Sequence, residues 1–410
     1  MWINRDKKTK TVEKRTDMEN KKLTKLEKYW IMYDVGNSAF VMLIATIIPI
    51  YFNYLAKSAG ISEVNYLAYW GYAASVSTVI VAVIGPVLGS IADMQNYKKP
   101  LFTISMMVGV IGCAAMSFPT SWVVFLAVFV IAKVGYNASL IFYDSMLVDI
   151  TSTDRMDEVS SQGYAWGYIG SCIPFILSLV LVLMYEKIGI TMHMAMTGAF
   201  FLNAVWWAVV TIPLLRNYRQ KNYVAVPSHS VKNSFKRLGQ TFMDVHKEKK
   251  IFWYLLAFFF FIDGVYTIIE MATAYGSALG LDSTGLLLAL LVTQIVAFPC
   301  ALICAKLSGK YPTERLIGVC IVAYIGIALF AIQLDKQWEF WTLAVLVGMF
   351  QGAIQALARS YFAKIIPAEK SGEYFGIYDI CGKGASFMGT TLVGIVAQVT
   401  GVANAGVAVI

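Results

Sequence analysis

The 410-residue chain is 58% apolar and only 14% charged. Charged residues make up about a quarter of an ordinary soluble protein, so this composition excludes that class and indicates a protein that crosses the membrane several times. The net charge of +8 would suit a nucleic-acid-binding domain. However, the basic residues lie beside apolar segments, where membrane topology places them, and we expect no nucleic-acid partner.

Apolar segments of about 20 residues, long enough to cross a bilayer, follow a basic tail at residues 1–28. Six lie in an N-terminal half at residues 29–215, and five lie in a C-terminal half at residues 251–410, after a polar linker at residues 216–250. Residues 401–410 are too short to cross, and the symmetry of the halves favours a twelfth span that is cut off. The predicted spans are residues 29–55, 66–92, 101–117, 121–149, 160–185, 194–215, 251–275, 284–305, 315–333, 338–362 and 372–399.

The distribution of positive charge predicts the orientation. The linker carries nine Lys or Arg, and the tail and the other segments on the same side are also basic, whereas the loops on the other side hold only Lys57, Lys187 and Lys336. Basic residues near span ends remain on the cytoplasmic side. We therefore expect a cytoplasmic N-terminus and linker, in a monomer that lies in the cell (plasma) membrane.

Cofactor and enzyme chemistry find no support in the sequence. The six cysteines all fall inside apolar segments without a paired ligand spacing, and the three histidines are far apart, so we expect no metal site. Residues 376–384 (GIYDICGKG) lack the spacing of a phosphate-binding loop, and no nucleotide domain exists to drive transport. We also find no nucleophile and base cluster, which argues against an enzyme.

The two halves repeat weakly but in order. Residues 86–98 and 299–311 occupy the same place after the second span of each half. Residues 161–170 parallel residues 371–380, and Tyr164 and Tyr168 match Tyr374 and Tyr378. Duplicated halves are typical of transporters in which one helical bundle rocks against the other around a central site. The sequence therefore predicts an all-α membrane protein with two six-helix halves.

Residues 85–99 (GPVLGSIADMQNYKK) resemble the signature loop of the major facilitator superfamily. Residues 33–40 (YDVGNSAF), 159–170 (VSSQGYAWGYIG) and 355–379 (QALARSYFAKIIPAEKSGEYFGIYD) are similar to the vacuole-effluxer-like family, which includes autophagy-related amino-acid exporters. The resemblance implies a rocker-switch transporter and an amino-acid substrate. It also implies gating roles for Gly89, Asp93 and Lys98, although Met94, Gln95 and Asn96 replace the arginine and glycine usual in the loop.

Polar side chains line one face of each of the four spans that, by the resemblance, surround the central cavity. Charge inside a membrane span is costly and therefore marks candidate functional residues, and spacings of three, four, seven or eleven place residues on one helical face. The candidate substrate- and ion-binding residues are Asp34, Asn37, Lys133, Asn137, Asp144, Asp263, Tyr266, Glu270, Gln351 and Gln355, and the further gating residues are Arg359, Asp379 and Lys383.

Lys133 and Asp263 lie deepest, about 18 Å into their spans at 1.5 Å per residue. Either they pair with each other and only stabilise the bundle, or they contact a substrate or ion. In the second reading Lys133 holds the carboxylate of an amino acid, Asp263 or Glu270 holds its amine, and Asp263 exchanges the coupling proton. Asp379 and Lys383 have the spacing of an intrahelical pair.

We therefore predict secondary transport of a small polar solute, an amino acid, with protons as the candidate coupling ion and the lipid bilayer as surroundings. Two alternatives remain open. An exporter of lipids or amphiphiles would have an apolar cavity open between the halves. A non-transporting sensor or scaffold would have its charges paired and no cavity.

Overall fold

The computed structural model describes residues 22–225, 239–241, 243–278 and 281–400. Most of the predicted basic tail, the centre of the linker and the predicted cut-off twelfth span at residues 401–410 lie outside these residues.

Each of the eleven predicted spans corresponds to a helix. The N-terminal half contains α2 (Lys25–Ala45), α3 (Ile47–Ser58), α4 (Glu63–Ala92), α5 (Lys98–Ala115), α6 (Trp122–Ser145), α7 (Leu147–Ile150), α8 (Met156–Leu183), α9 (Tyr185–Ile188) and α10 (Met192–Asn217). The C-terminal half contains α12 (Lys249–Ala278), α13 (Ser283–Leu307), α14 (Thr313–Ile332), α15 (Gln337–Ile365) and α16 (Ser371–Thr400). Among the described residues, ten segments are long and apolar enough to cross a membrane, and α16 is a further helix of 30 residues.

The first predicted span, residues 29–55, lies within one membrane-crossing segment, Lys25–Ser58, which is built from two helices. The chain leaves the helical conformation at Thr46, whose φ and ψ are −136° and −71°. Pro49 follows in the first turn of α3. Its missing N–H and its ring prevent a continuous helix through this point. The Thr46 hydroxyl donates to the carbonyl of Met42 and so satisfies one of the backbone groups that the break frees.

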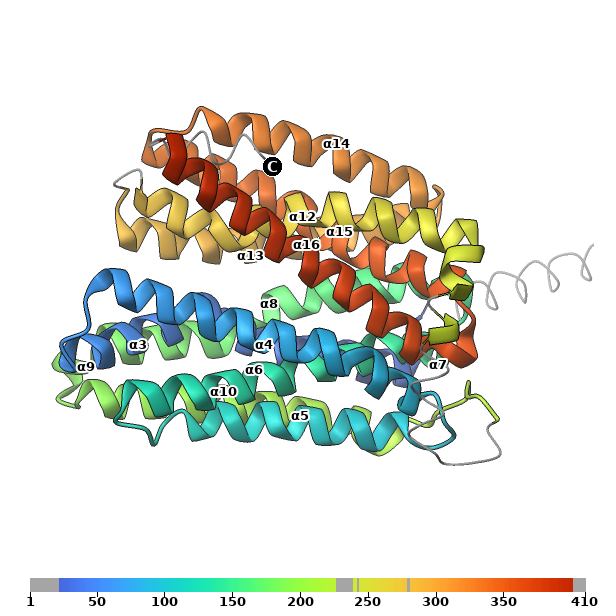
Figure 1. Ribbon diagram of the computed structural model, residues 1–410, viewed down its shortest axis with the longest axis horizontal. Coiled ribbons are helices and arrows are strands. Elements are labelled where there is room, and N and C mark those ends of the chain that lie inside the picture. Colours follow the sequence, from blue (N-terminus) through green and yellow to red (C-terminus); the bar gives the residue numbers. More distant parts are fainter. Residues whose placement is uncertain (1–21, 226–238, 242, 279–280, 401–410) are drawn as a thin grey trace, which may run out of the picture.

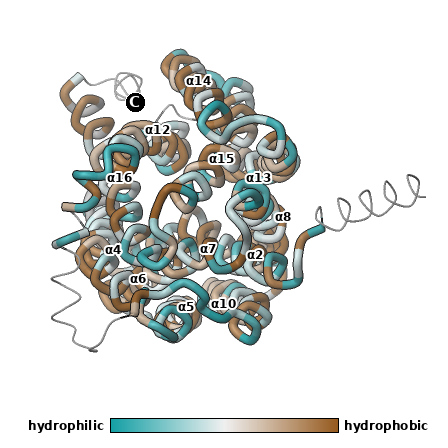
Figure 2. Tube along the Cα trace, turned by 90° about the vertical axis from the view of Figure 1, so that its right-hand side faces the viewer, coloured by the Kyte–Doolittle hydropathy of each residue, from teal (hydrophilic) through white to brown (hydrophobic). Residues whose placement is uncertain are grey.

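The two halves lie side by side, with the C-terminal half above the N-terminal half in Figure 1. They meet where α4 packs against α16 and where α8 packs against α13 and α15. We call the end of the bundle that carries residues 93–97, 151–155, 218–225 and 366–370 the linker end, and the other the opposite end. Figure 2 looks onto the linker end, where hydrophilic turns gather around α7.

The outer faces of the helices carry large exposed apolar side chains, as a lipid-facing surface requires. Examples are Val79 and Val83 on α4, Ile104 on α5, and Val319 and Val322 on α14. The buried core is rich in aromatic residues: Trp30 and Tyr143 stack with their ring centroids 4.4 Å apart. This rigid aromatic packing lies directly beside the charged residues described next.

Candidate functional site

Arg359, on α15 of the C-terminal half, reaches into the N-terminal half and is only 2% exposed. Its Nη1 donates to Asp144 Oδ1 at 3.0 Å, and its Nη2 donates to Asp34 Oδ2 at 3.3 Å. Its Nε donates to the hydroxyl of Ser160 at 3.0 Å. We call these four residues the arginine latch. Because Asp34, Asp144 and Ser160 come from α2, α6 and α8, the latch joins α15 to three helices of the N-terminal half.

Aromatic rings surround the same guanidinium group. Its carbon lies 4.6 Å from the ring centre of Trp30, 5.4 Å from that of Tyr143 and 4.5 Å from that of Tyr164. A cation over aromatic faces is attracted by the ring quadrupole. Gly163 leaves the necessary space, since a Cβ at this position would collide with Asp34 and lie 3.2 Å from Arg359 Nη2.

A second set of contacts joins the end of α4 to the start of α16. Asp93, which caps α4, accepts hydrogen bonds from the backbone N–H groups of Gly372 at 2.7 Å and Glu373 at 2.9 Å. The first N–H groups of a helix have no partner within it and carry partial positive charge, so a carboxylate suits this position. Lys98 adds a hydrogen bond from its Nζ to the hydroxyl of Ser371 at 2.8 Å. We call these five residues the loop latch.

A third set of contacts was not predicted from the sequence. Asp157, at the start of α8, accepts hydrogen bonds at 2.6 Å from Lys364 Nζ, from the hydroxyl of Thr313 and from the hydroxyl of Ser360. We call these four residues the α8 latch. An acid in the first turn of a helix is common, so Asp157 gave no separate signal. Ser360 and Lys364, four residues apart and beside Arg359, could have indicated a second polar face on α15.

Further charges lie between the halves, nearer the middle of the bundle. Lys383 and Asp379 form the predicted intrahelical pair on α16, with an N···O distance of 2.6 Å. Glu270 on α12 is exposed and accepts a hydrogen bond from Ser386 of α16 at 2.8 Å. Lys133 lies on α6, which packs against α16. The predicted polar faces of α6 and α12 and the predicted pair on α16 therefore lie on helices that pack together.

The structure does not bring Lys133 and Asp263 together. Asp263 accepts a hydrogen bond from the hydroxyl of Thr267 at 3.2 Å and faces the backbone at Gly389 on α16. Among the described ion pairs, none joins Asp263 to Lys133, whose ammonium lies 6.0 Å from the ring centre of Phe129. Of the two readings, pairing of these residues with each other is not found, because Asp263 points toward α16, and contact with a substrate or ion stays a prediction.

The remaining candidate residues lie in the interior. The side-chain amide of Asn37 donates to the Tyr33 carbonyl at 3.1 Å and to Asp34 Oδ1 at 3.4 Å. The second of these bonds orients the Asp34 carboxylate. Gln355 donates to the carbonyl of Gln351 at 3.1 Å. Asn137 and Gln351 are buried, and Tyr266 lies near Gly382 of α16.

Comparison with known proteins agrees with this architecture. The family described as "Vacuole effluxer Atg22 like" matches residues 24–154 and 148–410. The chain belongs to this family. An uncharacterized MFS-type transporter of Bacillus subtilis, YxiO, is 41% identical over 94% of this chain and 92% of its own length. Autophagy-related protein 22 of Coccidioides immitis is 21% identical over 82% of this chain and 68% of its own length.

Solved structures show the fold of this Atg22-like protein. A bacterial homologue of the iron transporter ferroportin, in an outward-facing state, has a TM-score of 0.65 at 12% identity, and covers 94% of this chain and 96% of its own. The fucose:proton symporter FucP of E. coli has a TM-score of 0.63 at 13% identity, with 93% of each chain covered. The Atg22-like protein thus has the bundle of a major facilitator transporter, as the signature loop predicted, and is a transporter rather than an enzyme.

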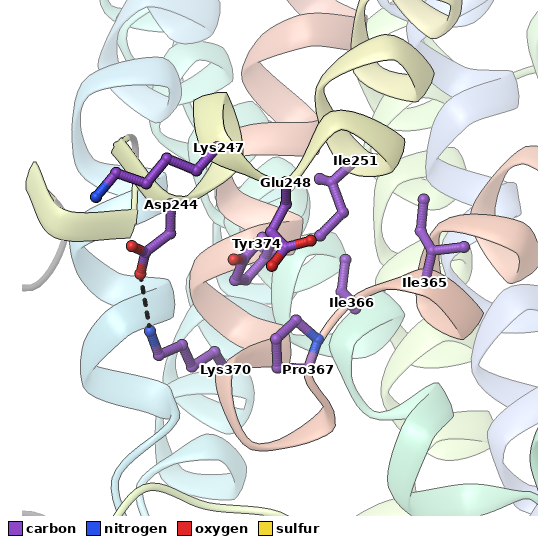
Figure 3. A pocket seen from close by; sticks show the side chains of 9 residues that line it. All are labelled: Asp244, Lys247, Glu248, Ile251, Ile365, Ile366, Pro367, Lys370 and Tyr374. Carbon is purple, nitrogen blue, oxygen red and sulfur yellow. Dashed lines mark hydrogen bonds and ion pairs between the residues drawn. The ribbon is translucent and has the colours of Figure 1, made fainter.

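A pocket at the linker end of the Atg22-like protein is lined by residues next to the loop latch and the α8 latch in sequence (Figure 3). It has a volume of about 440 Å³ and lies between the end of the linker and the turn from α15 to α16. Lys370 and Asp244 form an ion pair across it at 3.5 Å. Both side chains are more than a third exposed, so this pair contributes little stability. The lining residues are Asp244, Lys247, Glu248, Ile251, Ile365, Ile366, Pro367, Lys370 and Tyr374.

The loop latch should respond to pH. Burial raises the pKa of the Asp93 carboxyl to about 7, against the opposing effects of Lys98 and of the two backbone N–H groups. Once the halves separate, Asp93 meets water and its pKa falls toward the usual value of about 4. The latched form therefore binds a proton more tightly, and its stability relative to the separated form decreases as pH rises from about 4 to about 7.

We accordingly expect the linker end to be more open at pH 8 than at pH 5. The distance between spin labels at Gln95 and Glu369, exposed residues on opposite sides of the linker end, measures this opening. Asp93→Asn cannot titrate at this position and should remove most of the pH dependence. An equally pH-dependent distance in that variant would assign the effect to another group.

Proposed function

We propose that this protein moves a small polar solute, an amino acid, across the membrane by alternating access of a central site to the two ends of the bundle. The observation that carries the proposal is the set of charges on three helices that pack together, with Lys133 on α6, Glu270 on α12 and the Asp379–Lys383 pair on α16. Charges of both signs in an interior site suit a solute that carries both an ammonium group and a carboxylate. The wording "vacuole effluxer" of the family supports export of such solutes.

The three latches support the alternating-access part of the proposal. They join the halves at the linker end through hydrogen bonds of Asp93, Asp157 and Arg359. A rocker-switch transporter needs one end closed while the other is open. We infer that the structure represents the state closed at the linker end, and that transport requires all three latches to break.

The proposal is tested by counterflow in proteoliposomes loaded with unlabelled amino acids. Labelled amino acids added outside, in pools, should accumulate transiently in liposomes that contain the protein and not in empty liposomes. An Arg359→Leu variant, which cannot form the arginine latch, serves as the defective control. If no pool exchanges while purified protein is folded, the amino-acid proposal fails, and uptake of a fluorescent phospholipid by the same liposomes would favour the lipid-exporter alternative.

We further propose that the protein lies in the plasma membrane, with the linker end facing the cytoplasm and the opposite end facing the outside of the cell. We also propose that it acts as a monomer, because one chain supplies both halves of the path. The basic residues at the linker end support this orientation. A cysteine in place of Gln95, in a variant without native cysteines, should react with an impermeant maleimide only after the cell membrane is permeabilised. A cysteine at Asp335, exposed at the opposite end, should react in intact cells. The reverse labelling pattern would invert the orientation.

A more specific part of the proposal is that transport is coupled to protons and that Asp263 binds the coupling proton. The Asp263 carboxylate lies inside α12 with one side-chain hydrogen bond, from Thr267, and thus retains capacity to bind a proton. Asp263→Asn should abolish accumulation driven by a pH gradient and leave counterflow exchange at least partly intact. Thr267→Val, which removes only the hydrogen bond, is the control and should retain gradient-driven accumulation. Full gradient-driven transport in Asp263→Asn would exclude the coupling role.

A further inference from the structure

The surroundings of the Arg359 guanidinium all belong to the N-terminal half. The two carboxylates that bind it come from α2 and α6, and Ser160, on α8, offers its hydroxyl and its carbonyl. The aromatic rings come from the same three helices. Arg359 is therefore a single side chain of the C-terminal half inserted into a site that the N-terminal half builds alone. We call this site the cation cage; it consists of Trp30, Asp34, Tyr143, Asp144, Ser160 and Tyr164.

The cation cage does not depend on Arg359 for its shape. The indole of Trp30 donates to the carbonyl of Tyr143 at 3.0 Å, and the hydroxyl of Tyr143 donates to the carbonyl of Trp30 at 3.1 Å. Asn37 donates to the Asp34 carboxylate from within α2. These bonds lie within the N-terminal half. Ser160 also donates to the Ala356 carbonyl on α15 at 2.8 Å, so its hydroxyl loses a partner when the C-terminal half withdraws Arg359, whereas the acids and rings of the cage keep the bonds just described.

The emptied cage would hold two carboxylates and no cation. Two neighbouring carboxylates repel each other, so a cation that enters the emptied cage lowers the energy of both charges. The combination of two carboxylates with aromatic faces is the chemistry that recognises guanidinium and ammonium groups of organic ligands. A metal ion fits less well: in the described part of the chain, no cluster of three or more His, Cys, Asp or Glu could hold one.

We propose that the cation cage is a solute-binding site, which Arg359 occupies while the linker end is closed and which the guanidinium or ammonium group of a solute occupies when the linker end opens. This inference rests on the proposed function and narrows its substrate class. The carboxylate of an amino acid must lie far from the two acids of the cage. The class favoured is therefore a cation at the end of a flexible chain, such as a basic amino acid.

The first test uses the whole protein in lipid nanodiscs with ethylguanidinium as the probe and ethylurea, its uncharged analogue, as the control. Ethylguanidinium competes with Arg359, so it should lengthen the distance between spin labels at Gln95 and Glu369 in a saturable way. Ethylurea should leave that distance unchanged. Equal effects of the two compounds, or no effect of either, would overturn the proposal.

The second test examines the cage directly. Arg359→Ala vacates it and should bind ethylguanidinium measurably by calorimetry, and adding Tyr164→Leu should weaken that binding about tenfold, since one cation–π contact is lost. Adding Tyr168→Leu instead changes the tyrosine one turn along α8, which packs near Gly352, and should leave binding unchanged. Should Arg359→Ala fold poorly, the first test, on the protein with Arg359 in place, still decides the proposal.

The outcomes separate the two proposals. Counterflow of arginine and lysine in preference to neutral amino acids, together with ethylguanidinium binding, supports both. Counterflow of neutral amino acids without ethylguanidinium binding overturns the cation cage as a solute site and leaves the proposed function standing. Uptake of protons by Arg359→Ala, without ethylguanidinium binding, would also overturn it, because the carboxylates would then be neutralised by protons.

Discussion

Replacing Arg359 by leucine is expected to open the linker end and to reduce counterflow at least tenfold. The substitution leaves Asp34 and Asp144 buried without their cation, and removing one partner of a buried ion pair costs about 3–5 kcal/mol. That cost applies only to the closed state, since water reaches both carboxylates once the halves separate. The closed population should therefore fall by about a hundredfold or more. Spin labels at Gln95 and Glu369 would measure it.

Charge-neutral variants provide the control. Arg359→Leu combined with Asp34→Asn and Asp144→Asn removes the uncompensated charges, and it should recover much of the closed population without recovering transport. Lys370→Met removes a basic residue from the exposed pair with Asp244 at the same end and should have little effect. An unchanged label distance in folded Arg359→Leu would show that the loop and α8 latches alone hold the linker end closed.

Gly89→Ala is expected to force α4 and α16 apart. A Cβ at Gly89 would collide with the Gly372 carbonyl oxygen and lie 2.7 Å from its carbon and 3.1 Å from the Glu373 nitrogen. Backbone atoms cannot move aside as a flexible side chain can, and overpacking of this kind typically costs about 1–3 kcal/mol. The displacement would also lengthen the two hydrogen bonds of Asp93. We expect the closed population and the melting temperature to fall together.

Gly71→Ala is the matched control, because it makes the same substitution on the same helix. A Cβ at Gly71 would have no atom within 4 Å. It should leave the label distance and transport unchanged and raise the helix stability slightly, since alanine favours the helix over glycine. If Gly89→Ala behaves like Gly71→Ala, the contact between α4 and α16 is looser than the structure describes.

The local pattern of the sequence was enough for some features of the site. The fold followed from segment length and apolar content, since only a helix satisfies its own backbone groups in lipid. The Asp379–Lys383 pair followed from spacing along one helix. The gating position of Asp93 followed from the resemblance of residues 85–99 to the signature loop, and it remains a prediction until the distance measurement is made. Pro49 could have indicated the break at Thr46, because proline removes a backbone donor, but Pro86, Pro174 and Pro213 lie inside continuous helices, so a proline alone does not decide where a helix ends.

The sequence by itself therefore determined the helices, their grouping into halves and the faces that carry charge, because each of these depends on residues close together in the chain. Only the tertiary structure decided which charges meet. Asp263 points toward α16 and not toward Lys133, Asp157 gains three partners from the other half, and Arg359 enters a cage built by three helices of the N-terminal half. The helical period predicts toward which side of its own helix a side chain points. The partner it meets depends on how two separately formed bundles pack, and the arginine latch joins residues 325 positions apart in the chain.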